Sequence, residues 1–204
     1  MELMAAETFN GKIDRHFGSA LCEIGFEKIK ENKWVKDLET GIRKVVTMMH
    51  WKGAVSTPRW GYSLDYVPHF DNSYKNIYWH RTNKSAMIDV FPIYFDFFKY
   101  SFSRFSTPDE HSKKLKELMP EIIYDINEFY SSGCEMQDLV SILEKCHSSR
   151  SSGLDFWNWT QLPLAYAFVL NKSGESEKAK IILDKFVDRE NIAVSAKQKL
   201  IDRF

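Results

Sequence analysis

Apolar residues recur at steps of three and four positions along the N-terminal part of the chain, between Glu7 and Lys30. The residues that follow this spacing are Phe9, Ile13, Phe17, Leu21 and Ile24. Such steps place side chains on one face of an α-helix. The pattern therefore predicts an amphipathic helix that ends near Gly25 or within the following "EKIKEN".

A β-rich block follows, from about Lys33 to Phe102. "KWVKDLETGIRKVVTMMHWKG" predicts two strands around a turn at 39–41, and "RWGYSLDYVP" alternates apolar and polar positions as a third strand would. "NIYWHR" predicts a short fourth strand. "SAMIDVFPIYFDFF" predicts a fifth, in which Pro92 favours an edge or a bulge. Short turns between strands indicate an antiparallel sheet with one face in water, and the N-terminal helix is the expected cover of the other face.

Helical periodicity takes over after Phe105. "STPDEHSKKLKELMPEIIYDINEFY" predicts one helix with Thr107 as its N-cap, Pro108 as its first residue and a kink at Pro120. "CEMQDLVSILEKC" predicts the next helix. "LPLAYAFVLNKSGESEKAKIILDKFV" predicts two helices joined at Gly174, spaced as in one tetratricopeptide-type hairpin, and a last helix begins at Asn191. A single such hairpin favours packing over a peptide-binding array.

These elements predict an α+β fold. An N-terminal helix packs on an antiparallel β-meander of about five strands, and an all-helical C-terminal half with one tetratricopeptide-like hairpin follows. We expect 1–105 to hold the helix and sheet and 106–204 to be the helical half. The two halves are either separate domains or one composite domain that shares a core.

The composition limits the expected partners and cellular location of the protein. The chain has 204 residues, of which 44% are hydrophobic, and its 28 Lys and Arg balance its 28 Asp and Glu. A neutral chain has no overall field that would attract nucleic acid or an anionic membrane, so we expect neither as a partner. No apolar run approaches the roughly 20 residues of a membrane span. Three cysteines at unrelated spacings fit a reducing compartment, and we expect a cytoplasmic protein.

Aromatic residues supply the candidate contact surface. Trp60, Tyr62, Leu64 and Tyr66 alternate along one strand and are expected to form the inner face of the sheet. Other aromatic residues stand beside charges, and Trp and Arg carry a large share of interface energy in proteins. The predicted partner-binding residues are His50, Trp51, His69, Asp71, Trp79, His80 and Arg81.

The sequence offers little support for catalysis. The six histidines form no helical pair and no dense cluster with acids, so we predict no metal site. No Gly-rich phosphate loop and no activated Ser or Cys occurs, so we predict no cofactor and no catalytic residue. An enzyme alternative would use Asp65, Asp89 or Asp96 with Lys99 or a histidine as a metal-dependent hydrolase or nuclease. The run "KKLKE" at 113–117 reads as a solvated helix face.

One resemblance bears on function. The first half of the chain, with Gly25, Phe26, Lys28 and Trp34, resembles a group of small bacterial proteins of unknown function. In that group a helix ending in Gly-Phe-x-Lys precedes a β-meander that starts with an aromatic residue. Members are often encoded beside polymorphic toxins, which implies an immunity or accessory role. The group has no catalytic motif to transfer.

The favoured hypothesis is therefore a non-enzymatic protein that binds and blocks a cognate toxin or another partner protein through its surface. Two alternatives stay open. One is the hydrolase or nuclease described above. The other is a structural subunit of a larger, defence-type complex, which predicts an exposed apolar patch on the helical half. The sequence does not set the oligomeric state.

Overall fold

The computed structural model describes residues 4–37, 41–51, 55–70, 76–78, 100–131, 136–148 and 162–204. These residues form an α+β protein with an N-terminal helical stretch, a five-stranded sheet and a helical C-terminal half, as predicted. Contacts group the chain into two compact units, Met1–Ser63 with Pro92–Ser132 and Leu64–Phe91 with Gly133–Phe204. Compactness does not show which segments fold alone, so the predicted division into 1–105 and 106–204 stays a prediction.

The first unit begins with three helical segments in direct succession. They are α1 (Ala6–Ile13), the π-helical turn η1 (Asp14–Gly18) and α2 (Ser19–Glu23). Gly25 then adopts a φ of +87°, and the amide of Phe26 donates to the carbonyl of Leu21 at 3.0 Å. A glycine in the left-handed region is a common helix terminator. The predicted end near Gly25 is confirmed.

The main sheet has the strand order β1-β2-β3-β4-β7. Its strands are β1 (Glu27–Lys30), β2 (Lys33–Asp37), β3 (Ile42–Trp51), β4 (Val55–Leu64) and β7 (Phe102–Ser103). β2 and β3 pair antiparallel with Trp34 opposite Val46, and β4 pairs antiparallel with β7 with Ser56 opposite Phe102.

Two outer strands of this sheet differ from the prediction. β1 occupies the "EKIK" of the expected helix end, and β7 is only two residues long. Neither has the alternating apolar run that marks a strand in a sequence. The predicted fourth strand contains β6 (Ile77–Tyr78), which pairs with β5 (His69–Phe70) in a separate two-stranded sheet. The predicted fifth strand, 85–98, lies outside the described residues.

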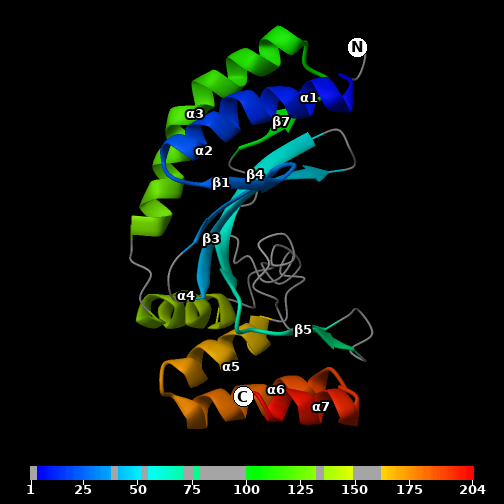
Figure 1. The fold of residues 1–204 in the computed structure, drawn as a ribbon, viewed down its shortest axis with the longest axis vertical. Helices are drawn as coiled ribbons and strands as arrows, with labels where there is room; N and C mark the ends of the chain where they lie inside the picture. Colours follow the sequence, from blue (N-terminus) through cyan, green and yellow to red (C-terminus); the bar gives the residue numbers. More distant parts are fainter. Residues whose placement is uncertain are drawn as a thin grey trace. The chain divides into compact units, whose positions relative to one another are not determined.

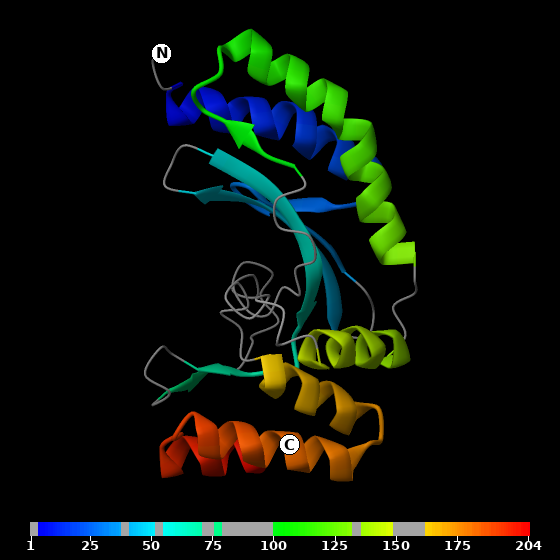
Figure 2. The same ribbon diagram turned by 180° about the vertical axis from the view of Figure 1, so that it is seen from behind.

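Helix α3 (Pro108–Ser131) completes the first unit. The hydroxyl of Thr107 accepts from the Glu110 amide, and the Glu110 carboxylate accepts from the Thr107 amide at 2.8 Å. This capping box confirms the predicted helix start. Pro120 lies within one continuous helix, as predicted, and Figure 2 shows α3 bending along its length. Figures 1 and 2 show α3 beside the α1–α2 stretch, on the same side of the sheet.

The core of the first unit lies between these helices and the sheet. The Trp34 side chain is fully buried and meets the Phe17 ring edge-on at 5.3 Å between centroids. The predicted cover by the N-terminal helical stretch is thus confirmed. The expectation that the opposite sheet face is in water is wrong at Val35 and Val45, which pair across β2 and β3 and are each 2% exposed. Both faces of the sheet carry buried side chains.

The apolar residues that alternate along β4 are internal, as predicted, whereas Tyr66 of the same predicted set lies in the turn after β4 and is half-buried. Trp60, Tyr62 and Leu64 are buried, and the Tyr62 ring lies 5.3 Å from that of Tyr130 on α3. The Tyr130 hydroxyl lies between β3 and β4, where it accepts from the Gly61 amide at 2.9 Å and lies 2.6 Å from the Gly61 carbonyl. It is also within hydrogen-bond distance of the Val45 amide and carbonyl. Helix α3 is therefore anchored in the sheet by this hydroxyl.

The described residues of the second unit form the β5–β6 pair and four helices. These are α4 (Met136–Ser148), α5 (Leu162–Lys172), α6 (Ser176–Arg189) and α7 (Val194–Ile201). α5 is buried from Leu162 to Leu170, as expected of a helix packed on several sides. The turn at Gly174, with a φ of +93°, and the packing of α5 on α6 confirm the predicted hairpin.

Candidate functional site

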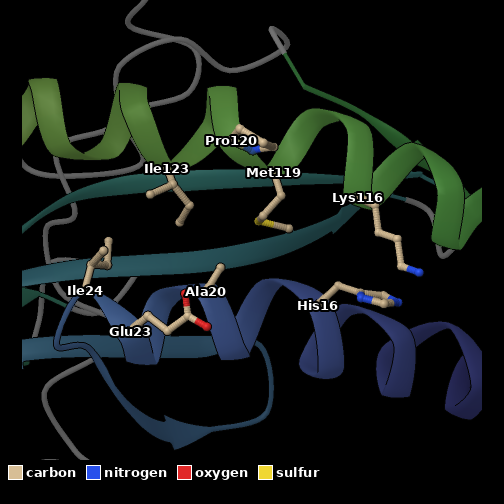
Figure 3. A pocket seen from close by; sticks show the side chains of 8 residues that line it. All are labelled: His16, Ala20, Glu23, Ile24, Lys116, Met119, Pro120 and Ile123. Atoms are coloured by element: carbon tan, nitrogen blue, oxygen red, sulfur yellow. The ribbon is translucent and has the colours of Figure 1, made fainter.

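A groove between the N-terminal helical stretch and α3 is the candidate site in the described residues of the first unit. It has a volume of about 390 Å³ and is lined by His16, Ala20, Glu23, Ile24, Lys116, Met119, Pro120 and Ile123. Volumes of roughly 300–1,000 Å³ are typical of ligand sites. Figure 3 shows Met119 and Ile123 reaching from α3 toward α2, with His16 and Lys116 together at one end.

Helical periodicity explains how each wall presents its residues. His16, Ala20 and Glu23 are four and three positions apart, so they form one stripe on η1 and α2. Lys116, Pro120 and Ile123 form the corresponding stripe on α3. Each stripe runs beside the buried face of its helix. The groove is therefore the open seam above the contact between two packed helices.

Both walls are irregular at the groove. His16 belongs to the π-helical turn, and π-turns inside helices occur frequently at functional sites. On the other wall Pro120 has no amide hydrogen, so the carbonyl of Lys116 lacks its usual helical donor. A wide turn and a proline bend therefore face each other across the seam.

The end of the groove near His16 is positively charged. Burial lowers the pKa of His16, and the positive charges of Lys116, Arg15 and Lys12 lower it further. The imidazole is therefore neutral near pH 7 and retains one donor and one acceptor nitrogen. Lys12 also donates to the Ser112 hydroxyl at 2.6 Å, which ties α1 to α3 beside this end.

The opposite end is fixed by the sheet. The Lys36 ammonium on β2 donates to the carbonyl of Ile24 at 2.9 Å, at the end of α2. Glu23 is the acidic residue among those lining the groove, and it lies seven residues from His16. At 1.5 Å per residue this separation is about 10 Å along a helix. The groove thus has a cationic end at His16 and Lys116, apolar side chains along its α3 wall, and one acid, Glu23, beside Ala20 on its α2 wall.

Among the described residues that line the groove there is no Ser, Cys, Thr or Tyr, and His16 is the one histidine. The apolar side chains of Met119, Ile123 and Ile24 can exclude water from a bound apolar group. The cationic end can accept a carboxylate or a phosphate.

The predicted partner-binding residue His50 lies on β3 in the first unit and is not among the residues that line the groove. Its Nε2 lies 2.8 Å from the Asn32 amide nitrogen and its Nδ1 contacts the Ser56 hydroxyl. Donation by the Asn32 amide makes Nε2 the acceptor, so Nδ1 carries the proton and donates to Ser56. Burial lowers the pKa of His50, as does Arg104, against the opposing charge of Glu31.

Ser56, His50 and Asn32 are residue types that can form a catalytic nucleophile, its base and a side chain that orients the base. The likeness ends at the residue types. The Ser56 side chain is fully buried, with no exposed surface from which it could attack a substrate. Asn32 sits in the β1–β2 turn with a φ of +59°. The bridge through His50 therefore holds that turn and β3 to β4, which is a structural role.

The remaining predicted residues are spread over the two units and the undescribed part of the chain. Trp51 ends β3 in the first unit, and His69 begins β5 in the second. Asp71, Trp79, His80 and Arg81 lie outside the described residues. The predicted contact surface therefore stays a prediction.

The enzyme alternative is tested only in part. Within the described ranges, no group of three or more His, Cys, Asp or Glu side chains could hold a metal ion. Asp65 lies in the turn after β4. Asp89, Asp96 and Lys99 lie outside the described residues, so their convergence stays untested.

The groove residues were missed in the sequence for identifiable reasons. Lys116 was read as part of a solvated helix face, and it is indeed exposed. Met119 and Ile123 make the apolar stripe of α3 wider than one buried face requires. This extra width is the feature of the sequence that could have indicated the groove. His16 carried no signal, because only the packing of α3 beside η1 makes it part of a site.

The second unit exposes several apolar side chains. They are Tyr78, Ile181, Val194 and Ile201. Val194 is 84% exposed, and Ile201 lies seven residues later on the same face of α7. These residues are compatible with the alternative of a subunit in a larger complex, which stays a prediction.

The described residues form an α+β protein with a groove between two helical walls. Comparison with protein families, curated proteins and solved structures finds no match to this chain. The resemblance of the N-terminal half to small bacterial proteins therefore stays a prediction. In the part of the chain that the structure describes, no helix is long and apolar enough to span a membrane.

Proposed function

We propose that this chain is a non-enzymatic binding protein of the immunity or accessory type, which engages and blocks a toxin or another partner protein. The groove between η1–α2 and α3 is its docking site. The observation that carries the proposal is an open seam of about 390 Å³ with apolar side chains along its α3 wall and with His16 and Lys116 at one end. Grooves of this kind accept an amphipathic segment of a partner by burying its apolar side chains.

The resemblance to proteins encoded beside polymorphic toxins supplies the class of partner, and the product of the neighbouring gene is the first one to test. Titration calorimetry of the full chain with that product should give a tight complex. Ile123→Glu places a charge on the apolar wall, and Ala20→Leu fills the groove without adding charge. Each should weaken binding at least about tenfold, because a hot spot contributes about 2 kcal/mol or more.

Ile181→Glu is the matched control, because Ile181 is an exposed isoleucine on α6 in the second unit. It should leave the affinity unchanged. Circular dichroism and thermal melting would establish that all three variants are folded. Wild-type affinity in both folded groove variants would show that the groove is not the docking site.

A further inference from the structure

The cationic end of the groove is not neutralised by the protein itself. Lys116 and Arg15 have no ion-pair partner among the described residues, whereas the nearby Asp14 is paired with Lys28 at 2.6 Å and Lys113 lies 3.9 Å from Glu117. The positive charges of Lys12, Arg15 and Lys116 all act on His16. Like charges held together destabilise a protein slightly, and an incoming anion relieves that repulsion.

His16 adds a directional contact at the same end. A neutral imidazole can donate one hydrogen bond to an anion without the desolvation cost of a second buried charge. Lys116 adds the point charge, and Figure 3 shows both side chains at this end of the groove. A carboxylate placed between them would gain one hydrogen bond and one ion pair.

Glu23 fixes the direction in which an occupant lies. It would repel an acid placed near the α2 end, whereas an acid near His16 is separated from it by about two helical turns. Met119 and Ile123 offer apolar side chains along the α3 wall. The occupant must therefore carry an acidic group at one end and apolar side chains within the next two turns.

We propose that the groove receives an apolar segment of the partner protein whose acidic side chain binds between His16 and Lys116. This inference rests on the proposed function, because it specifies the segment that docks. A protein segment fits better than a nucleic acid, since the chain as a whole is neutral and a phosphate backbone leaves the apolar side chains of the α3 wall unused.

Three matched amphipathic peptides, each about twelve residues long with leucines along one helical face, would test this. They differ at one position, a turn before the first leucine, which is Glu, Gln or Lys. Fluorescence anisotropy with the full chain should rank the Glu peptide about tenfold tighter than the Gln peptide, as for a hydrogen-bonded charge, with the Lys peptide weakest. Added NaCl should reduce the preference for Glu.

Lys116→Met should abolish most of the preference for Glu and leave the affinity for the Gln peptide nearly unchanged. Lys180→Met is the matched control, because it removes the same charge from an exposed position on α6. The His16 ring signals in NMR spectra should shift more with the Glu peptide than with the Gln peptide.

Equal affinity for the Glu and Gln peptides, or an unchanged preference in Lys116→Met, would overturn the acidic recognition. If the peptides bound without a preference for Glu and Ile123→Glu abolished that binding, the groove would remain the proposed docking site without recognition of an acidic side chain. Absence of binding by every peptide would overturn this inference, and calorimetry with the neighbouring gene's product would then judge the proposed function separately. If a single-stranded oligonucleotide bound at the His16 end more strongly than the Glu peptide, the natural ligand of this end would be the phosphate of a nucleic acid and not an acidic side chain.

Discussion

At the scale of single residues, His111 is the side chain most at odds with its surroundings. It is 1% exposed, and its ring lies 4.5 Å from that of Phe9 and 5.9 Å from that of Phe102. Neither ring nitrogen has a hydrogen-bond partner among the described residues. Burial lowers its pKa to about 4, assisted by the positive charges of Lys12 and Lys114 and by His16 when that imidazole is protonated at low pH. The folded protein therefore keeps this imidazole neutral.

His111 should make the stability of the protein depend on pH. In the unfolded chain the imidazole binds a proton below its ordinary pKa of 6.5, whereas the folded chain resists protonation down to about 4. The free energy of unfolding therefore falls as the pH is lowered through this window, by up to about 3 kcal/mol. Above pH 6.5 the contribution is constant.

His111→Leu should remove most of this pH dependence. Urea unfolding at a series of pH values should show a shallower loss of stability between pH 6.5 and 4 in the variant. At pH 8 the variant should be as stable as the wild type or more so, because it no longer buries an imidazole without hydrogen bonds. Parallel curves for the two proteins would show that His111 is not kept neutral by the fold.

At the scale of elements, the spacing of the core residues explains the π-helical turn. Phe9, Ile13, Phe17 and Leu21 are each four residues apart. A regular α-helix has 3.6 residues per turn, so a strict spacing of four rotates the stripe by about 40° at each step. A π-turn contains more residues per turn and returns Phe17 and Leu21 to the face that carries Ile13. All four side chains are 1% exposed or less.

Two glycines of this stretch form a natural pair of tests. A Cβ added to Gly18 in η1 would lie 3.3 Å from the Trp34 indole, whereas a Cβ at Gly11 in α1 would meet nothing within 4 Å. Trp34 is fully buried against Phe17 and has little room to move. Gly18→Ala should therefore lower the free energy of unfolding, by about 1–3 kcal/mol.

Gly11→Ala should instead raise the free energy of unfolding, by about 0.5–1 kcal/mol, because alanine has the higher helix propensity. Thermal unfolding of the two variants under one set of conditions would compare them directly. Stabilisation by both substitutions would mean that the π-turn and the indole relax without cost.

At the scale of the whole molecule, each unit has its own buried core. The first unit buries Trp34 and its neighbours, and the second packs Leu183 and Phe186 of α6 among the helices. Truncation of a core side chain costs about 2–5 kcal/mol, while surface changes cost about 0.5 kcal/mol or less. We expect the truncation to lower the free energy of unfolding of the unit that contains the side chain.

Leu183→Ala should therefore accelerate amide hydrogen exchange in α5 and α6 and leave α3 protected. Ile181→Ala on the same helix is the matched control, since Ile181 is 56% exposed and Leu183 is 3% exposed. Exchange measured by mass spectrometry on the intact chain would locate the change. Equal loss of protection in α3 would show that the two units unfold as one.

Much of the fold could be predicted because local sequence patterns specify its helices and turns. The capping box at Thr107 and Glu110, the turn at Gly174 and the described C-terminal helices α3 to α7 follow from short-range chemistry. The strands β1 and β7 could not be predicted, because each exists only by pairing with a longer neighbour. The same applies to the hydroxyl of Tyr130, which reaches backbone atoms of Val45 and Gly61 far away in the sequence.

The candidate site was less predictable than the fold. Patterns of aromatic and charged residues indicated a surface around His50 and Trp79, and no pattern indicated His16 or Lys116. A binding site depends on which helix faces meet, and His16 and Lys116 are 100 positions apart. The charge of Lys116 acts on His16 only because α3 lies beside η1.

The sequence by itself determined the α+β class and the caps and turns that begin and end the main helices. It also determined which side chains form the buried face of each helix. These features depend on periodicity and on nearby residues. Only the tertiary structure decided the membership of the main sheet, the burial of both its faces, the π-turn's role in a groove wall and the meeting of His16 with Lys116. Contacts between distant segments have no local signature, because their energy arises only when the whole chain brings those surfaces together.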